Sequence, residues 1–237
     1  MNWQERTELL LGEENIAKLK QANVLVVGLG GVGAYAAEQL CRAGIGKLTI
    51  VDSDVVEETN INRQLPALTS TIGKSKTEVL AKRFMDINPE LKLTIVHDYI
   101  NSDKTIELIK SQPFDYIVDA IDTLAPKVFL IYHAMQEGIK LVSSMGAGGK
   151  TDPTNVHIVD ISKSYNCKLA KLIRKRLSKF GIKKGFQVVF SPEEISRKAV
   201  RAEEGQNKKS TVGTISYMPP IFGCFISSVV IRDLTSQ

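Results

Sequence analysis

The stretch covering residues 24–64 constrains the fold of this chain more than any other. An apolar run at residues 24–27 leads directly into the glycine pattern Gly28-x-Gly30-x-x-Gly33. Such a turn lets backbone approach a phosphate closely, and the helix after it offers unpaired N–H groups and a positive dipole end. The pattern predicts a nucleotide site here, whereas the alternative is a plain strand–helix turn with packing glycines.

An acidic residue follows this turn at the sequence spacing typical of a nucleotide-binding strand–helix–strand unit. A second apolar run at residues 48–51 ends at Asp52, which is 19 residues after Gly33. A carboxylate at that place in a strand–helix–strand unit hydrogen-bonds the ribose of a bound nucleotide. The order of strand, glycine turn, helix, strand and acid makes the nucleotide interpretation stronger than the glycines alone would.

The rest of the chain alternates between strands and helices. Strands are predicted at residues 24–27, 48–51, 93–96, 116–120 and 141–144, and helices at 32–43, 73–88, 104–110 and 123–137. Continuous apolar strands between helices predict an α/β fold of the Rossmann-like, doubly wound type, with a mainly parallel sheet covered by helices on both faces. Further strands at 155–160 and 187–190 predict a mixed extension of that sheet.

The two ends of the chain differ from this core. Residues 1–20 are predicted to form a helical arm, broken near Gly12, with an apolar face of Leu9, Leu10, Ile16 and Leu19. Residues 21–150 form the predicted nucleotide-binding core. Residues 151–237 are predicted to contain a basic helix (168–184), a mobile loop (191–211), a short strand (214–217) and an apolar helix (219–234). We expect the whole chain, 1–237, to be one domain.

Composition allows an anionic partner without requiring one. The 237 residues carry a formal net charge of +5. The three cysteines are far apart and form no C-x-x-C pair, so neither a zinc ribbon nor a redox dithiol is predicted. The charged N-terminus is unlike a signal peptide, and the apolar run at residues 218–231 is short for a membrane span and contains two prolines. We therefore expect a cytoplasmic protein without a membrane partner.

Polar side chains gather after the predicted strands, where doubly wound folds place their sites. Asn60, Arg63 and Gln64 follow the second strand, while Lys74 and Lys76 fall in the first turn of the predicted helix 73–88. A cation in the first turn opposes the helix dipole, and a nearby phosphate would explain it better than solvation does.

The end of the fourth predicted strand carries two acids, Asp119 within it and Asp122 just after it. Cations such as Arg63 and Lys76 around a nucleotide do not suit hydride transfer, which needs a nicotinamide pocket and a proton donor. With a metal-capable Asp122 they suit ATP, whose charge must be neutralised during displacement at phosphorus.

Five motifs together resemble the ubiquitin-activating-type adenylating superfamily. They are Gly28-x-Gly30-Gly31-x-Gly33, Asp52-x-Asp54, Asn60-x-x-Arg63-Gln64, Gly73-Lys74-x-Lys76 and Asp119-x-x-Asp122. The resemblance implies that the glycine turn, Asp52 and Asp54 bind ATP and that Asp52 holds the ribose. It implies that Asn60, Arg63, Gln64 and Lys76 hold the phosphates, and that Asp122 binds Mg²⁺ and orients the attack. It also implies a homodimer, in which Arg6 reaches the site of the partner subunit.

The later part of the chain is similar to one branch of that superfamily. The zinc-binding cysteine pairs of the sulfur-carrier-activating branch are missing, and KLIRKRLSKFGIKKG, VVFSPEE and GTISYMPPIFGCFISSVVIRDL stand in that region. These segments are similar to bacterial enzymes that dehydrate threonylcarbamoyladenosine in tRNA. The resemblance implies adenylation of the threonyl carboxylate by ATP, then ring closure with release of AMP.

The same resemblance implies further partners. Members of the family are linked to a structural alkali cation, K⁺ or Na⁺, and to a cysteine desulfurase or sulfur-acceptor system. The basic helix at 168–184 would hold the tRNA backbone, although a solvated helix face explains its charges equally well. Cys167 falls roughly where thioester-forming relatives carry their cysteine, and we interpret it as a bystander.

Two other functions compete with this one. The first is an activator of the C-terminus of a ubiquitin-like or sulfur-carrier protein, against which the missing zinc motifs and the basic helix count. The second is a dinucleotide oxidoreductase, which needs only the glycine turn and Asp52 and leaves Arg63, Lys76 and Asp122 unexplained.

Overall fold

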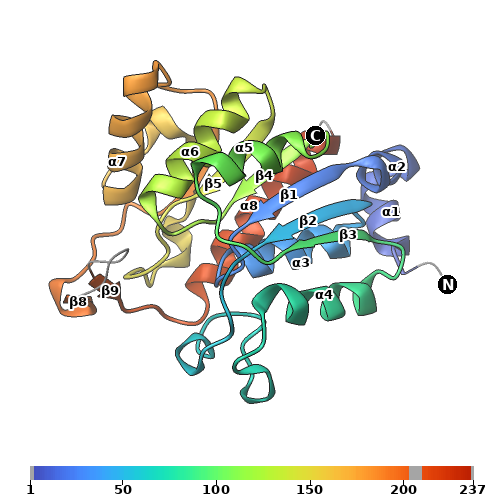
Figure 1. Cartoon of the computed structure of the whole chain (residues 1–237), viewed down its shortest axis with the longest axis horizontal. Coiled ribbons are helices and arrows are strands. Elements are labelled where there is room, and N and C mark those ends of the chain that lie inside the picture. The colour runs from blue at the N-terminus through green and yellow to red at the C-terminus, as the bar shows by residue number, and fades with distance from the viewer. Residues whose placement is uncertain (1–2, 203–209, 236–237) are drawn as a thin grey trace.

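The structure is a computed structural model that describes residues 3–202 and 210–235, and its centre is a seven-stranded sheet (Figure 1). The strand order is β3-β2-β1-β4-β5-β7-β6. The strands are β1 Asn23–Val27, β2 Lys47–Val51, β3 Lys92–Val96, β4 Tyr116–Asp119, β5 Lys140–Ser144, β6 His157–Asp160 and β7 Gln187–Phe190. All neighbours run parallel except β6, which pairs antiparallel with β7.

The parallel register brings the predicted site residues to one edge of the sheet. Val27, the last residue of β1, lies opposite Val51 of β2 and Asp119 of β4. The glycine turn, the segment after Asp52 and the turn to Asp122 therefore leave the sheet side by side at its carboxyl edge. Sites in open α/β sheets form at this edge, where the strand order reverses between β1 and β4.

Helices cover both faces of the sheet (Figure 1). One face carries α3 (Gly33–Ala43), α4 (Lys76–Ile87) and α8 (Met218–Thr235), and the other carries α5 (Ser102–Lys110), α6 (Leu124–Gln136) and α7 (Lys168–Leu177). The strands β1 and β4 are buried along their whole length because both faces are covered. These features confirm the predicted α/β class, the doubly wound parallel sheet and its mixed extension.

The N-terminal arm is helical as predicted, but the prediction that Leu9 and Leu10 belong to its apolar face with Ile16 and Leu19 is wrong. Gly12, with φ of 83°, separates α1 (Glu5–Leu11) from α2 (Glu13–Gln21), as predicted. Ile16 and Leu19 of α2 are buried, whereas Leu9 and Leu10 of α1 are 82% and 80% exposed. The turn at Gly12 changes the direction of the chain, so α1 does not continue the buried stripe of α2.

The helix predicted at 73–88 begins three residues later, at Lys76. Gly73 takes the left-handed conformation with φ of 81°, and the carbonyl of Lys74 accepts a hydrogen bond from the amide of Val56. Ser75 forms a bridge with Val55 before the helix starts. Lys74 therefore lies in the preceding turn, and only Lys76 has the first-turn position that we predicted for both lysines.

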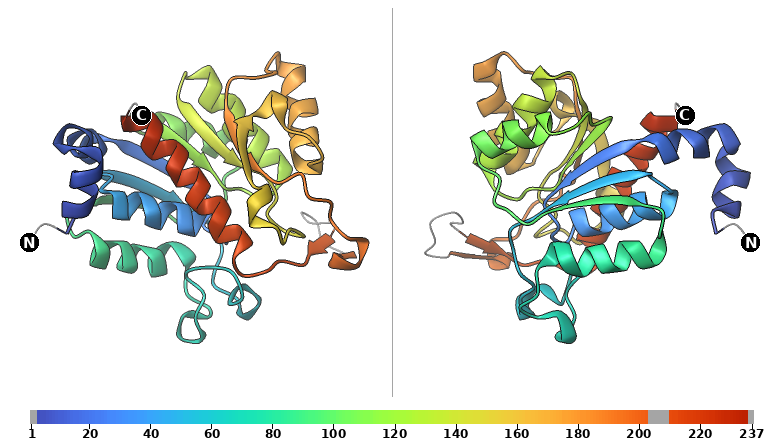
Figure 2. Two further views of the ribbon diagram at one scale, coloured as in Figure 1. Left: turned by 180° about the vertical axis from the view of Figure 1, so that it is seen from behind. Right: turned by 45° about the vertical axis from the view of Figure 1, so that its right-hand side comes forward.

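The segment predicted as a mobile loop contains paired backbone. Strands β8 (Val200–Ala202) and β9 (Ser210–Val212) form an antiparallel ribbon, while residues 203–209 lie outside the described residues. The strand predicted at 214–217 is wrong, because that stretch is an irregular connection to α8. The ribbon and α1 lie at opposite ends of the molecule in all three views (Figures 1 and 2).

The basic helix predicted at 168–184 is present but shorter: α7 ends at Leu177, a 3₁₀ turn follows it, and residues 181–184 are not helical. Six such turns occur among the described residues: Glu58–Asn60, Thr69–Thr71, Pro153–Asn155, Ile161–Lys163, Ser178–Phe180 and Arg197–Ala199. The first of them belongs to the loop that follows β2, and it carries a predicted site residue, Asn60.

The last helix is longer than the sequence predicts. In the described part of the chain α8 extends over 18 residues and is by length and composition apolar enough to cross a membrane, so the prediction that it is too short is wrong. Half of that stretch is buried inside the molecule. It lies along one face of the sheet (Figure 2), where a Cβ at Gly223 would come within 2.7 Å of the carbonyl oxygen of Val32 in the α3 N-cap. This close approach identifies α8 as a core helix of the fold.

Candidate nucleotide site

Two of the predicted site glycines are required for packing. Gly28 has φ of 90°, and a Cβ there would lie 2.7 Å from the carbonyl oxygen of Ala120. A Cβ at Gly33 would lie only 1.8 Å from the carbonyl oxygen of Gly28. These glycines let the turn between β1 and α3 close tightly against the end of β4.

The other two glycines differ in what they face. A Cβ at Gly31 would lie 2.9 Å from Cβ of Pro219, at the start of α8. At Gly30 the nearest atom would be Nε2 of Gln64, 3.9 Å away, and φ is not positive. Gly30 is therefore the position in the turn where backbone borders open space, which is what the approach of a phosphate requires.

Asp52 is tied to the glycine turn. One of its carboxylate oxygens accepts a hydrogen bond from the amide of Leu29 at 2.6 Å, and the other accepts one from the amide of Asp54 at 2.8 Å. Burial raises the pKa of the Asp52 carboxyl above its ordinary value, and the charge of Lys76 opposes that rise. Because the folded-state pKa is raised, ionised Asp52 reduces stability above that pKa, and the penalty is relieved as the pH falls through it.

Lys76 supplies a nearly buried cation beside Asp52. Its side chain is 5% exposed, and its ammonium lies 2.8 Å from a carboxylate oxygen of Asp54, whose side chain is 65% exposed. The amide of Lys76 also donates to the carbonyl of Asp54. The structure thus brings Asp52, Asp54 and Lys76 together, and an anion would find the lysine already held in place by the fold.

The loop after β2 holds three predicted residues in different ways. Asn60 is 6% exposed, and its side-chain oxygen accepts a hydrogen bond from the amide of Glu57. One guanidinium nitrogen of Arg63 donates to the carbonyl of Thr59 at 2.9 Å and to the side chain of Asn62 at 2.8 Å. Asn60 therefore shapes the loop, while Arg63 is held half-buried against it.

Gln64 carries an orphaned polar atom. Its side-chain oxygen is buried and has no hydrogen-bond partner in the described structure. Leaving such an acceptor unpaired costs about 1–3 kcal/mol. The same side chain lies beside the open position at Gly30. The atom of that amide nearest Gly30 is its nitrogen, which can donate a hydrogen bond to a phosphate there.

The two acids at the end of β4, Asp119 and Asp122, lie in different environments. Asp122 is exposed in the turn between β4 and α6, whereas Asp119 is completely buried in an ion pair with Lys127. Only the outer acid is accessible to a ligand. Sequence reasoning missed Lys127, although a lysine within the apolar stretch of residues 124–135 was a signal of a buried charge.

Within the described residues no group of three or more His, Cys, Asp or Glu side chains could hold a metal ion. Mg²⁺ does not need such a group, because one carboxylate plus substrate phosphates is its usual environment in nucleotide enzymes. Exposed Asp122 at the carboxyl edge fits that requirement.

Arg6 is not brought to the site of its own chain. It is exposed on α1, next to a turn in which the side chain of Gln4 donates to the carbonyl of Ala43 at the end of α3. The glycine turn lies at the other end of α3, a helix of 11 residues that spans about 16 Å. Arg6 therefore lies at the opposite edge of the sheet from the other predicted residues.

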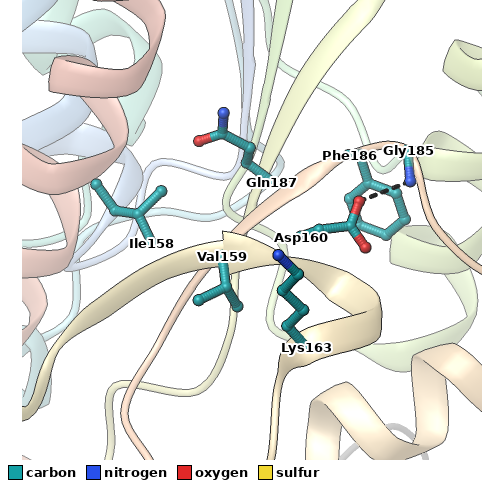
Figure 3. A pocket seen from close by; sticks show the side chains of 7 residues that line it. All are labelled: Ile158, Val159, Asp160, Lys163, Gly185, Phe186 and Gln187. Carbon is teal, nitrogen blue, oxygen red and sulfur yellow. Dashed lines mark hydrogen bonds between the residues drawn. The ribbon is translucent and has the colours of Figure 1, made fainter.

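Two hollows lie outside this cluster. One, of about 460 Å³, is at the outer strand β6, where a carboxylate oxygen of Asp160 accepts from the amide of Gly185 at 2.7 Å (Figure 3). The other, of about 440 Å³, lies between α6 and α7. It is lined by Leu124, Leu172, Lys175, Arg176 and Lys179, and we call it the α6–α7 hollow.

Two relatives of the same name are similar to this chain over most of its length. A tRNA threonylcarbamoyladenosine dehydratase of Bacillus subtilis is 40% identical over 237 residues, which cover 97% of this chain and 93% of the relative. The enzyme of the same name from Escherichia coli is 41% identical over 201 residues, covering 81% and 75%.

Solved structures extend the likeness to three dimensions. The crystal structure of the Escherichia coli tRNA N6-threonylcarbamoyladenosine dehydratase in complex with ATP matches with a TM-score of 0.89 and 35% identity, over 99% of this chain and 95% of that one. The complex with AMP matches with a TM-score of 0.88 and 36% identity, over the same shares of both chains.

The family model described as the ThiF family matches residues 4–237. The match includes the N-terminal arm, the glycine turn, the buried cation and the last helix. This chain belongs to the ThiF family.

Proposed function

We propose that this chain is an ATP-dependent dehydratase that cyclises threonylcarbamoyladenosine in tRNA. The observation that carries the proposal is its likeness, over nearly the full length, to dehydratase structures with bound ATP and AMP. The cluster of Gly30, Asp52 and Lys76 at the carboxyl edge supports it, because these residues suit a nucleotide and its phosphates.

The chemistry needs an activated carboxylate. The threonyl carboxylate attacks the α-phosphorus of ATP, a new O–P bond forms, and pyrophosphate leaves. An atom of the same modified side chain then attacks the acyl carbon, and AMP leaves with the carboxylate oxygen, so that the nucleoside loses one water overall. Ring closure within one bound molecule is favoured by proximity and requires no nucleophile from the enzyme.

The described residues divide this work. We assign the glycine turn and Asp52 to binding of ATP, with Asp52 on the ribose and Asp54 holding Lys76 in place. Arg63, Gln64 and Lys76 are assigned to the phosphates, and buried Asn60 to shaping the loop that carries Arg63 and Gln64. Mg²⁺ held by Asp122 and the phosphates would supply charge neutralisation. Lys76 is the nearly buried cation among them, so its attraction to developing negative charge is little screened by water.

A homodimer is part of the proposal. Arg6 lies at the opposite edge of the sheet from its own site, so only a second copy can bring such an arginine to it. Leu9 and Leu10 leave apolar surface on the same helix, as an interface would. Sedimentation velocity measures this directly, and a monomer at working concentrations would remove Arg6 from the site.

Four expectations remain predictions from the sequence. They are that the whole chain is one domain, that the protein is cytoplasmic, that it binds a structural K⁺ or Na⁺, and that it has a sulfur-system partner. The single seven-stranded sheet supports the first of these.

We place the tRNA backbone on the α6–α7 hollow. Lys175, Arg176 and Lys179 line it, and Leu124 at its edge follows Asp122 by two residues. Phosphates bound there would lie beside the carboxyl edge of the sheet. Arg174, by contrast, donates to the carbonyl of Ser164 at 2.9 Å and therefore has a structural role in α7.

Reversing the three hollow cations to glutamate in Lys175→Glu/Arg176→Glu/Lys179→Glu is expected to weaken tRNA binding at least about tenfold and to flatten its dependence on salt, because fewer counterions are released. ATP affinity should not change. Fluorescence anisotropy with labelled tRNA and calorimetry with ATP measure the two affinities.

The matched control reverses Lys20, Lys47 and Lys92, which are exposed at the amino edge of the sheet. It changes the net charge equally but should leave tRNA affinity within about twofold of the wild type at moderate salt, where distant charges are screened. If both triple variants lost tRNA affinity equally, the lysines and arginine of the hollow would act only through the overall charge of the protein, and the hollow would not be the tRNA site.

Product analysis distinguishes this function from the alternatives. With tRNA that bears threonylcarbamoyladenosine, the protein should release AMP and pyrophosphate in equal amounts. An activator of protein C-termini would release neither with this tRNA, although it would also use ATP. A dinucleotide oxidoreductase would show no ATP turnover at all.

A further inference from the structure

A buried ion pair lies next to the turn that carries Asp122. Asp119 is the last residue of β4 and Lys127 lies in α6, and both side chains are 0% exposed, with 2.8 Å between the ammonium and a carboxylate oxygen. Burying two charges is costly, and a pair of apolar side chains usually stabilises a fold as well or better. The pair therefore calls for a reason other than stability.

The contacts of the pair supply that reason. The ammonium of Lys127 also donates to the carbonyl of Ile121 at 2.9 Å, and the amide of Ile121 donates to Asp119 at 3.1 Å. Ser143 at the end of β5 donates to the other oxygen of Asp119 at 2.6 Å. Both backbone polar groups of Ile121 are thus held by the two charged side chains, and the next residue is Asp122.

The other side of the turn is fastened to the glycine turn. The amide of Ala120 donates to the carbonyl of Val27 at 2.9 Å, and the carbonyl oxygen of Ala120 lies 2.7 Å from where a Cβ of Gly28 would be. Residues 119–121 are therefore anchored to β1 on one side and to the buried pair on the other. A pair of apolar side chains could fill the same volume but could not form hydrogen bonds with the backbone of Ile121.

We propose that Asp119 and Lys127 are positioning residues that fix Asp122 relative to the glycine turn. This inference rests on the proposed role of Asp122 toward ATP. The pair itself touches no substrate, because both side chains are sealed from solvent. Its effect is to give the Asp122 carboxylate one place at the carboxyl edge.

The test uses a neutral pair, Asp119→Asn/Lys127→Met. Asparagine can still accept from Ile121, methionine has nearly the shape of lysine, and no unpaired charge is left in the core. Lys127→Met alone would bury an uncompensated carboxylate and could unfold the protein. We expect the neutral pair to melt cooperatively, to keep the KM for ATP within about twofold, and to lower kcat for AMP formation about 10- to 100-fold, as small misplacements of reacting groups do.

A control separates positioning from the loss of another ion pair that has a buried carboxylate. Glu38 is 6% exposed and pairs at 2.5 Å with Arg83, whose side chain is 46% exposed, between α3 and α4, on the other face of the sheet from α6. Arg42 also pairs with Glu38. Glu38→Gln/Arg83→Met removes that pair and should leave kcat unchanged. A fall in kcat equal to that of the neutral pair would show a general loss of rigidity and overturn the proposal.

The decisive arm combines the neutral pair with Asp122→Asn, assayed by release of radiolabelled AMP. If the pair acts through Asp122, the combined variant should be as slow as Asp122→Asn alone, because residues that act as a unit are not additive. Two results would overturn the inference. One is a wild-type kcat for the neutral pair, and the other is that the neutral pair lowers kcat by the same factor in the Asp122→Asn protein as in the wild type. A wild-type rate for Asp122→Asn itself would instead remove Asp122 from the proposed function.

Discussion

Replacing Lys76 with methionine will lower the rate of AMP formation by at least about 100-fold, the loss typical for removing one group that stabilises transition-state charge. The protein will stay folded, because the partner left behind, Asp54, is 65% exposed and can be solvated by water. The loss will exceed any effect on tRNA binding, since Lys76 lies inside the site and away from the α6–α7 hollow.

The measurement is steady-state release of AMP together with thermal unfolding. Lys18→Met is the matched control, because Lys18 also forms an ion pair, with Glu14 at 2.9 Å, but on α2 at the far edge of the sheet. The control should retain full activity. If Lys76→Met turns over at a rate within about fivefold of the wild type, the assignment of this residue to the phosphates is wrong.

Alanine substitutions at two glycines of the same turn will distinguish an effect on stability from an effect on ATP binding. Gly33→Ala will destabilise the protein by about 3 kcal/mol, the upper range for overpacking, because the added methyl group would meet the carbonyl oxygen of Gly28 at 1.8 Å. Gly30→Ala will change stability by less than about 0.5 kcal/mol, since its Cβ has ordinary space. It will nevertheless weaken ATP binding more than about tenfold, because the methyl group occupies the approach of a phosphate.

Urea unfolding and calorimetric titration with ATP measure the two effects. Each variant serves as the control of the other, since both add one methyl group within a single turn. Unchanged ATP affinity in Gly30→Ala would mean that phosphates do not approach the turn at this position. Wild-type stability in Gly33→Ala would contradict the tight closure between β1 and α3.

Much of the fold could be predicted from the sequence because the core is repetitive. Buried strands such as β1 and β4 are continuous apolar runs, and the helices between them have a regular apolar face. The predictions that were wrong concern segments in which the local sequence pattern does not determine the tertiary packing. Leu9 and Leu10 have helical spacing but no core of their own to cover. The ribbon β8–β9 pairs two short segments that look polar in isolation.

The sequence predicts which residues gather at the carboxyl edge of the sheet, but not the geometry in which they lie there. Strand order alone places Asp52, Lys76 and Asp122 at one edge, as expected. The sequence could not distinguish Gly30, which borders open space, from Gly33, which is needed for packing. Nor could it show that Asp119 is buried against Lys127, since that pairing joins β4 to α6 and depends on how the two pack.

Mass spectrometry of nucleosides tests the central claim most directly. Purified protein is incubated with ATP, Mg²⁺ and tRNA that bears threonylcarbamoyladenosine, and the tRNA is digested and its nucleosides are weighed. We predict that the modified nucleoside loses the mass of one water, only when ATP is present and not with Lys76→Met. An unchanged nucleoside mass, with ATP binding intact, would contradict the proposed function and favour a protein C-terminus as the carboxylate that is activated.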